Sequence, residues 1–237
     1  MWWNPLMTHP PPSPGSVFFN AAAVARYTEG PPRVVPGFAD MHRMTALLLA
    51  ERVPENGRVL VVGAGGGLEL LAFARAQPGW SFDGVDPSAE MIQLAGKTLK
   101  EHASRTRLHH GFIDDAPEGP FDAATCLLTM HFVEVEERRS MLAEIHRRLR
   151  PGSPLVVMHM SFPQDEAGRS TWLARYAAYA VSSGVDGQDA RRAVSAIDSQ
   201  LNILSPEQDE AILRDAEFSN VSLFYAGLTF RGWVAYA

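Results

Sequence analysis

The chain has 237 residues, of which 46% are hydrophobic and 20% charged, with a formal net charge of −6. This length suits one α/β domain with additions, and the acidic balance argues against a nucleic-acid binder. A single cysteine, Cys126, excludes a disulfide framework and fits a reducing cytoplasm. The sequence contains no apolar run of about 18 residues, so it predicts no membrane span. The basic run His146–Arg150 ends a predicted helix, where positive charge suits the helix dipole; phosphate binding is the alternative.

The first 16 residues contain five prolines and no basic run, which predicts a flexible arm over 1–16 and not a signal peptide. A single domain is then expected over 17–237, beginning with a short helix at Val17–Tyr27. The proline-rich segment EGPPRVVPGF is expected to break that helix. Asp40 is expected to cap a second helix that runs to about Arg52.

Strand and helix patterns alternate from Arg58 to His159. The predicted strands cover 58–62, 81–85, 107–111, 121–128 and 154–159, and the predicted helices cover 68–76, 89–103 and 135–149. This alternation predicts βαβ units in a doubly wound α/β sheet. Ligands of such folds lie at the carboxyl ends of the strands.

The pattern changes after His159. Helices over 171–183 and 189–201, with no strand between them, predict a helical lid at about 165–204 over the carboxyl edge of the sheet. A further helix is predicted over 206–216. The closing runs 221–225 and 230–236 are separated by too few residues for a crossover, so they should form an antiparallel pair.

The stretch VLVVGAGGGLEL, Val59–Leu70, joins the first predicted strand to the following helix. Its glycines follow a G-x-G-x-G pattern, and Leu68 stands where a dinucleotide turn requires its third glycine. Glycines allow positive φ and close approach of the backbone to a ligand. Asp86, after the second strand, can accept hydrogen bonds from both ribose hydroxyls, or it only caps the next helix. The turn therefore favours a nucleoside with an amino-acid tail over one with a pyrophosphate.

Four motifs in order resemble those of the class I S-adenosylmethionine-dependent methyltransferases: VLVVGAGGG, GVDPSAEMIQLA, FDAATCLLTMHFV and RRLRPGSPLVVMH. The resemblance covers about residues 19–237. It implies a seven-stranded Rossmann-like sheet with an antiparallel last strand, N-terminal helices and a helical insertion after the fifth strand. It also implies S-adenosylmethionine as cofactor and S-adenosylhomocysteine as product. Many members carry an acidic residue two positions before the first glycine, where this chain has Val61.

The same resemblance implies a set of cofactor contacts. Tyr27 or Arg26 is expected to bind the methionine carboxylate, unless Tyr27 only packs on the sheet, and Phe38 is expected to lie beside the cofactor. The adenine is expected near the loop after the third strand, where Phe112 replaces a frequent aspartate, and the sulfonium near the end of the fourth strand. The remaining expected contacts are Gly63, Ala64, Gly65, Gly67, Asp86, Pro87, Met91, Ile113, Asp114, Leu127 and Leu128.

Three segments, RVVPGFADMHRM, DPSAEMIQLA and FYAGLTFRGWVAYA, resemble the branch that contains carboxy-S-adenosylmethionine synthases. The arginine and asparagine of that branch fall on Ile212 and Leu127. Both are apolar, and a buried carboxylate without polar partners is costly. The favoured function is therefore methyl transfer to a small organic acceptor; the alternatives are a synthase-like enzyme and a cofactor-binding protein without catalysis. Leu68 argues against a nicotinamide enzyme.

Methyl transfer from a sulfonium is an in-line displacement, so alignment supplies much of the catalysis. If the acceptor must lose a proton, His131 and His159 are the candidate general bases, because each follows a strand that ends at the ligand crevice. Each could instead cap a loop. Trp172, Tyr176 and Tyr179 are expected either to roof the acceptor site or to form plain core. The sequence predicts a cytoplasmic enzyme without metal, nucleic-acid or membrane partners, and it leaves a homodimer open.

Overall fold

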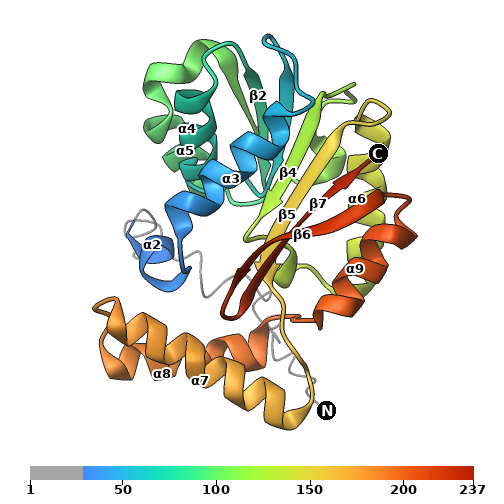
Figure 1. The fold of residues 1–237 in the computed structure, drawn as a ribbon. Coiled ribbons are helices and arrows are strands. Elements are labelled where there is room, and N and C mark those ends of the chain that lie inside the picture. The colour runs from blue at the N-terminus through green and yellow to red at the C-terminus, as the bar shows by residue number, and fades with distance from the viewer. Residues whose placement is uncertain (1–28) are drawn as a thin grey trace, which may run out of the picture.

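The computed structural model describes residues 29–237 (Figure 1). The predicted arm over 1–16 and the predicted helix at Val17–Tyr27 lie outside the described residues. Among residues 29–237, no helix combines the length and apolar character that crossing a membrane requires.

Seven strands form one sheet in the order β3-β2-β1-β4-β5-β7-β6. They are β1 (Arg58–Val62), β2 (Ser81–Asp86), β3 (Thr106–His110), β4 (Ala123–Leu127), β5 (Pro154–Met160), β6 (Ser219–Gly227) and β7 (Phe230–Tyr236). The first five strands pair in parallel, and β7 pairs antiparallel with β5 and β6. The predicted fold class, with its antiparallel last strand, is confirmed.

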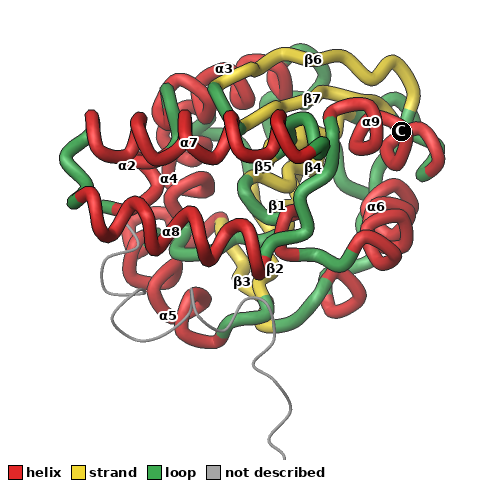
Figure 2. The backbone as a smooth tube through the Cα atoms, turned by 90° about the horizontal axis from the view of Figure 1, so that it is seen from below, coloured by secondary structure: helices red, strands yellow, loops and turns green. Residues whose placement is uncertain are grey.

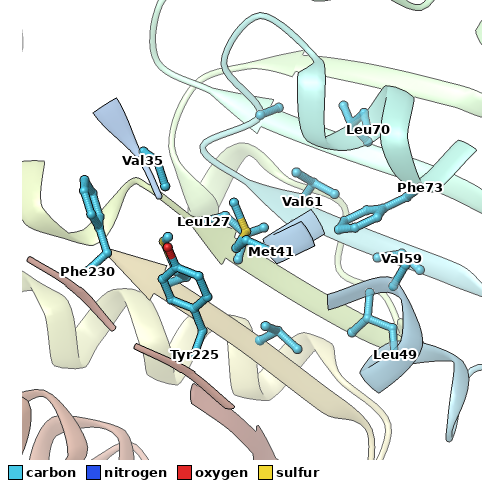
Figure 3. Close-up of a cluster of buried hydrophobic side chains, with 14 of the residues drawn as sticks. Val35, Met41, Leu49, Val59, Val61, Leu70, Phe73, Leu127, Tyr225 and Phe230 are labelled. Atoms are coloured by element: carbon cyan, nitrogen blue, oxygen red, sulfur yellow. The ribbon is translucent and has the colours of Figure 1, made fainter. Parts of the chain in front are cut away.

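Helices cover both faces of the sheet (Figures 1 and 2). One face carries α3 (Phe38–Ala50), α4 (Leu68–Ala76) and α5 (Ala89–Thr98), and the other carries α6 (Val135–Arg148) and α9 (Pro206–Asp215). Because side chains alternate along a strand, β1 contributes to both cores. Val59 and Val61 pack with α3 and α4 (Figure 3), whereas Leu60 and Val62 pack with α6 and α9.

One short helix was not predicted, and one predicted helix start needs correction. The proline-rich segment forms a short helix, α2 (Gly30–Val34), because Pro31 stands in its first turn, where a missing N–H matters least. Asp40 is not the cap of α3. The cap position is Gly37, whose φ of 60° lies in the left-handed region, and Asp40 stands in the first turn. An acidic residue is favourable there because of the helix dipole.

The predicted helix 89–103 is also shorter than expected. It ends at Thr98, and the chain continues as a 3-10 helix, η1 (Lys100–Arg105). Gly96 and Thr98 have low helix propensity. The Arg105 guanidinium then donates to the carbonyls of Gln77 and Trp80, which holds η1 against the preceding α4–β2 loop.

The predicted lid forms a helical hairpin of α7 (Glu166–Ser182) and α8 (Gly187–Gln200) at the carboxyl end of the sheet (Figures 1 and 2). The helix α7 begins before the predicted residue 171 because the Asp165 carboxylate caps it by accepting from Gly168 N at 2.9 Å. The chain returns through Leu201–Leu204, where Leu204 bridges to Ser161 after β5. Two further 3-10 turns, η2 (Ile113–Asp115) and η3 (Met130–Phe132), follow β3 and β4.

The predicted basic run at the end of α6 is paired within the protein. Arg147 and Arg148 both form ion pairs with Glu144, and Arg147 also pairs with Glu118. Positive charges at the last turn of a helix are favourable because the C-terminal end of the helix dipole is negative. The structural interpretation of this run is therefore confirmed for these two arginines.

Candidate cofactor and acceptor site

The strand order changes direction at β1, with β2 and β3 on one side and β4 and β5 on the other. The loops after β1 and β4 therefore leave the sheet in opposite directions and open a crevice at its carboxyl edge. The glycine turn follows β1, Asp86 ends β2, and Leu128 follows β4. The predicted cofactor residues outside the N-terminal segment and α3 thus belong to neighbouring strands or the segments that follow them, with Met91 in the first turn of α5.

The glycine turn has a backbone that other residues rarely adopt. Gly63, Gly65 and Gly67 have φ values of 75°, 49° and 82°. A Cβ at Gly63 would lie 2.0 Å from the Oγ1 of Thr129, so the absence of a side chain lets this turn pack against the loop after β4. At Gly67, the start of α4, a Cβ would lie 3.1 Å from the Cα of Ala95. The predicted glycine requirement is physically explained at these positions.

Asp86 faces the glycine turn from the end of β2 and is only 5% exposed. Its Oδ2 accepts from Gly65 N at 2.8 Å, and its Oδ1 accepts from Ser88 N at 2.9 Å. Burial raises the pKa of Asp86, while these two N–H groups and nearby His110 act to lower it. The cap of α5 is Ser88, whose hydroxyl accepts from Met91 N at 3.2 Å. Asp86 is therefore not the side-chain cap of this helix.

These groups fit a nucleoside. An ionised carboxylate offers about four acceptor positions. Two of those of Asp86 are occupied by backbone N–H groups. The other two are the acceptors that a pair of ribose hydroxyls requires. The positive-φ turn beside it has no side chains in the way of a ligand tail at Gly63, Gly65 and Gly67.

The predicted adenine loop divides into open and buried parts. Phe112 is 70% exposed, and its backbone N–H donates to Asp115 Oδ2 at 2.9 Å. Asp114 is exposed as well, whereas Ile113 is buried in the core on the α6 side. Beside this loop, His110 Nε2 donates to the carbonyl of exposed Pro87 at 3.0 Å. The loop therefore presents an open aromatic ring near the end of β2.

The other predicted cofactor residues lie on both sides of the crevice. Ala64 and Met91 are buried, and Ala64 N donates to the carbonyl of Val85 at 3.0 Å. Leu127 is buried at the end of β4, and Leu128 takes a left-handed φ of 57° that is sparsely populated for such a residue. The ring of Phe38 lies 4.5 Å from that of His42 on α3, which is a contact within the helix. Tyr27 lies outside the described residues.

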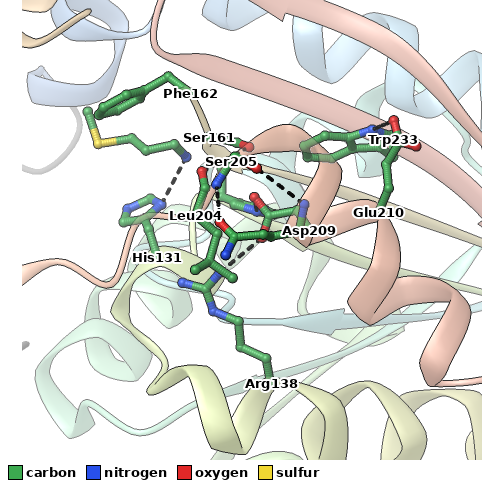
Figure 4. A network of polar contacts seen from close by, with 12 residues as sticks. His131, Arg138, Ser161, Phe162, Leu204, Ser205, Asp209, Glu210 and Trp233 are labelled. Carbon is green, nitrogen blue, oxygen red and sulfur yellow. Dashed lines mark hydrogen bonds and ion pairs between the residues drawn. The ribbon is translucent and has the colours of Figure 1, made fainter. Parts of the chain in front are cut away.

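His131 is held inside the protein by a backbone contact. It is 5% exposed, and its Nδ1 accepts from Met160 N at 3.3 Å (Figure 4). Burial, together with nearby His159 and Arg138, lowers the pKa of His131 well below 6.5. A neutral imidazole that accepts through Nδ1 carries its proton on Nε2, and so has no free lone pair for a substrate proton. This geometry is that of the loop-capping alternative, and the general-base role stays a prediction.

His159 belongs to a buried charged network. It is fully buried, with Nε2 3.1 Å from Asp209 Oδ2. Asp209 Oδ1 in turn accepts from Arg138 Nη1 at 3.0 Å (Figure 4). Arg138 also donates to the carbonyl of Asn202, whose N–H donates to the carbonyl of His131. Burial alone would raise the pKa of Asp209, but His159, Ser161 and Arg138 hold it below its ordinary value. The network ties α6, β5 and α9 to the return segment of the lid, and a catalytic role of His159 stays a prediction.

The sequence reasoning missed Arg138 and Asp209, because both stand in charged helical runs that look solvent-facing. It also missed Glu69, which is only 6% exposed in the first turn of α4. Thr125 Oγ1 donates to the Glu69 carboxyl, and burial raises the pKa of Glu69 to about 8. Thr125 is the register partner of Val61. A carboxyl group therefore lies beside the strand position at which the resembled family often has its acid. Among residues 29–237, no cluster of His, Cys, Asp and Glu could hold a metal ion.

Comparison with known proteins agrees with this geometry. Residues 59–152 match the family model described as a methyltransferase domain. This segment contains the glycine turn, Asp86, all of β1 except its first residue, and β2 to β4. With the sheet order and the antiparallel β7, this match agrees with the predicted resemblance to the class I S-adenosylmethionine-dependent methyltransferases.

The relatives extend the match beyond this segment. The chain is 26% identical over 225 residues to the carboxy-S-adenosyl-L-methionine synthase of Chromohalobacter salexigens, covering 92% of this chain and 82% of the relative. Among solved structures, Haemonchus contortus phosphoethanolamine N-methyltransferase 2 covers 94% of the chain with a TM-score of 0.68 and 13% identity. Human N-acetylserotonin methyltransferase covers 95% with a TM-score of 0.61 and 12% identity. The chain spans 58% and 59% of these two structures, which show the fold.

Proposed function

We propose that the chain binds S-adenosylmethionine and transfers its methyl group to a small organic acceptor. The observation that carries this proposal is the pairing of the Gly63–Gly67 turn with Asp86. The carboxylate is oriented by two backbone N–H groups and retains two acceptor positions. Both solved structures named above are, by name, methyltransferases in complex with S-adenosylmethionine.

Each group has a separate part in the proposed site. Asp86 accepts from the ribose hydroxyls, and the exposed ring of Phe112 covers the adenine. Leu127 and Leu128 line the place of the donor methyl at the end of β4. The bound sulfonium supplies an activated methyl group. The protein then contributes mainly alignment of the acceptor, a factor that can supply roughly 7–11 kcal/mol of the barrier.

Calorimetry with S-adenosylmethionine tests the proposal. The variant D86N keeps the side-chain volume but removes the charge, and we expect its affinity to fall by about tenfold or more, because charge-assisted hydrogen bonds contribute about 1.5–3 kcal/mol each. The matched control is D122N. Asp122 also accepts a backbone N–H, from Arg58 at 2.8 Å, but at the amino ends of the strands. No binding to the intact protein, or equal affinities of D86N and D122N, would overturn the proposal.

The second candidate is a carboxy-S-adenosylmethionine synthase-like enzyme, which the identity to the Chromohalobacter salexigens relative over most of both chains favours. Two positions oppose it. Ile212 packs against the apolar core on the α6 side, and Leu127 is 4% exposed, so neither offers a polar partner to a second carboxylate. Mass spectrometry of the ligand that co-purifies separates the two functions. A ligand with one added carboxyl group supports the synthase, and an unmodified cofactor or its demethylated product supports methyl transfer.

A cofactor-binding protein without catalysis is the remaining alternative. It predicts affinity for S-adenosylmethionine without turnover on a broad panel of small acceptors. The proposed setting is the cytoplasm, which the near absence of cysteine favours. Light scattering of the purified chain tests whether it is a monomer or a homodimer.

A further inference from the structure

Two arginines contact one tryptophan between the lid and the end of the β6–β7 hairpin. The guanidinium carbon of Arg175, on α7, lies 4.4 Å from the ring centroid of Trp172, and that of Arg231, on β7, lies 5.2 Å from the same centroid. Figure 1 shows the hairpin end approaching the lid. The two distances place the guanidinium carbons at most 9.6 Å apart, about the screening length of 8–10 Å, so the two like charges are near enough to repel.

Neither arginine has a carboxylate partner in the part of the chain that the structure describes. Arg169 and Arg192 on the same lid pair with Asp198 and Asp189, but Arg175 has only its contact with Trp172. Arg231 donates to the carbonyls of Leu228 and Phe230. Residues 1–28 contain no Asp or Glu, so the remainder of this chain brings no carboxylate side chain to them.

Aromatic side chains lie near Arg231 in addition to Trp172. Tyr225 is close enough to both Tyr179 and Arg231 to interact with them electrostatically, and its hydroxyl donates to the carbonyl of Pro36. Figure 3 shows Tyr225 beside Phe230 and Val35. Arg231 is partly buried among these groups, and burial lowers its pKa. A partly buried cation without a counter-ion is a favourable place for an anion.

The register of the sheet relates this place to the proposed methyl donor. Leu127 pairs with Met158, and His159, the next residue of β5, pairs with Arg231. Leu128 and Arg231 are thus at nearly the same level, two strands apart. Since neighbouring strands are about 4.8 Å apart, their backbones are separated by roughly 10 Å.

We propose that Arg175 and Arg231, with Trp172, bind an oxyanion group of the methyl acceptor, a carboxylate or a phosphate. The guanidinium groups neutralise the oxyanion, and the indole contacts the adjoining apolar part of the molecule. The acceptor is then a small anionic molecule whose charged group lies between the lid and β7, two strands across the sheet from the end of β4. That the bound molecule is the methyl acceptor rests on the proposed function; the anion site itself does not.

Binding of three aromatic probes tests the site. Benzoate and phenyl phosphate carry the two oxyanions, and benzamide is the uncharged control. We expect benzoate or phenyl phosphate, or both, to quench tryptophan fluorescence saturably and to bind more weakly at higher salt. Benzamide should bind at least fivefold more weakly than the better oxyanion, and the preference between the two oxyanions identifies the acceptor group.

Three variants assign the binding to the proposed residues. We expect R175Q to weaken the better probe at least fivefold and R231K to retain part of the affinity, while R192Q, on an exposed residue of α8, leaves it unchanged. Equal binding of all three probes, or equal effects of R175Q and R192Q, would overturn the anion site. S-adenosylmethionine affinity should be unchanged in R175Q. Failure of the intact chain to bind that cofactor would instead overturn the proposed function and leave the probe result standing.

Discussion

The two halves of the carboxyl edge are built differently. At β1 and β2, a glycine turn and one carboxylate form the candidate ligand site from residues close together in the sequence. At β5 and β7, the charged side chains Arg138 of α6 and Asp209 of α9 are turned inward, where they contact each other, His159 and the backbone of the lid's return segment. The first half leaves acceptors for a ligand, and the second uses polar groups to hold the lid. Chemistry-bearing residues at this edge therefore do not all serve a ligand.

The largest expected effect is on the inward network. D209N removes the charge that faces Arg138, which is fully buried. Breaking one partner of a buried pair typically costs about 3–5 kcal/mol. We expect urea denaturation to show a loss of this size, while the affinity for S-adenosylmethionine of the folded variant stays within about twofold.

The control for D209N is D198N, because Asp198 pairs with Arg169 at a largely exposed position. An exposed pair contributes about 0–1 kcal/mol. Equal losses in D209N and D198N, or a large loss of cofactor affinity in D209N, would remove the contrast between the two halves.

The next effect concerns Glu69, beneath the glycine turn. Its pKa is about 8 in the folded protein against an ordinary value of 4.5. Below pH 4.5 the carboxyl is protonated in both states, so its burial carries no ionisation penalty. As pH rises from 4.5 to 8, the unfolded chain ionises first, and the folded state loses stability relative to it, on the order of a few kcal/mol. E69Q should abolish this loss.

Urea denaturation across this pH range measures the effect of E69Q. The control is E90Q, which changes an exposed glutamate in the first turn of α5. We expect the wild type and E90Q to share the same slope above pH 5, and E69Q to have a flatter one. A wild-type slope in E69Q would show that the buried acid does not set this dependence.

The smallest of these effects separates strain from contact in the glycine turn. G63A and G152A both place alanine at positive φ, 75° and 77°, which costs about 1–2 kcal/mol in each. Only the Cβ at residue 63 meets another group, Thr129, because nothing lies within 4 Å at Gly152. We expect G63A to be the less stable variant, and G63A alone to lose S-adenosylmethionine affinity. If G63A and G152A gave identical results in calorimetry and denaturation, the contact between the glycine turn and the loop after β4 would have no measurable effect.

Prediction from the sequence succeeded where the signal was local. Apolar runs such as Arg58–Val62 and Phe230–Tyr236 matched their strands, since a buried strand must be apolar along most of its length. The glycine spacing matched positive φ at all three positions for an equally local reason. Prediction failed at Asp40 and in the 89–103 helix, where the backbone at Gly37 and the contacts of Arg105 decided the ends.

The sequence by itself determined the class of sheet, the glycine turn and the placement of Asp86 beside it. The reason is that hydrophobic periodicity, glycine spacing and the succession of strands and helices can each be recognised within a short stretch of sequence. Only the tertiary structure decided which charged side chains are buried. Arg138 and Asp209 are 71 residues apart, and Glu69 and Thr125 are 56 apart. These polar and charged side chains can be buried only because the fold brings a partner from a distant part of the sequence to each of them and excludes water.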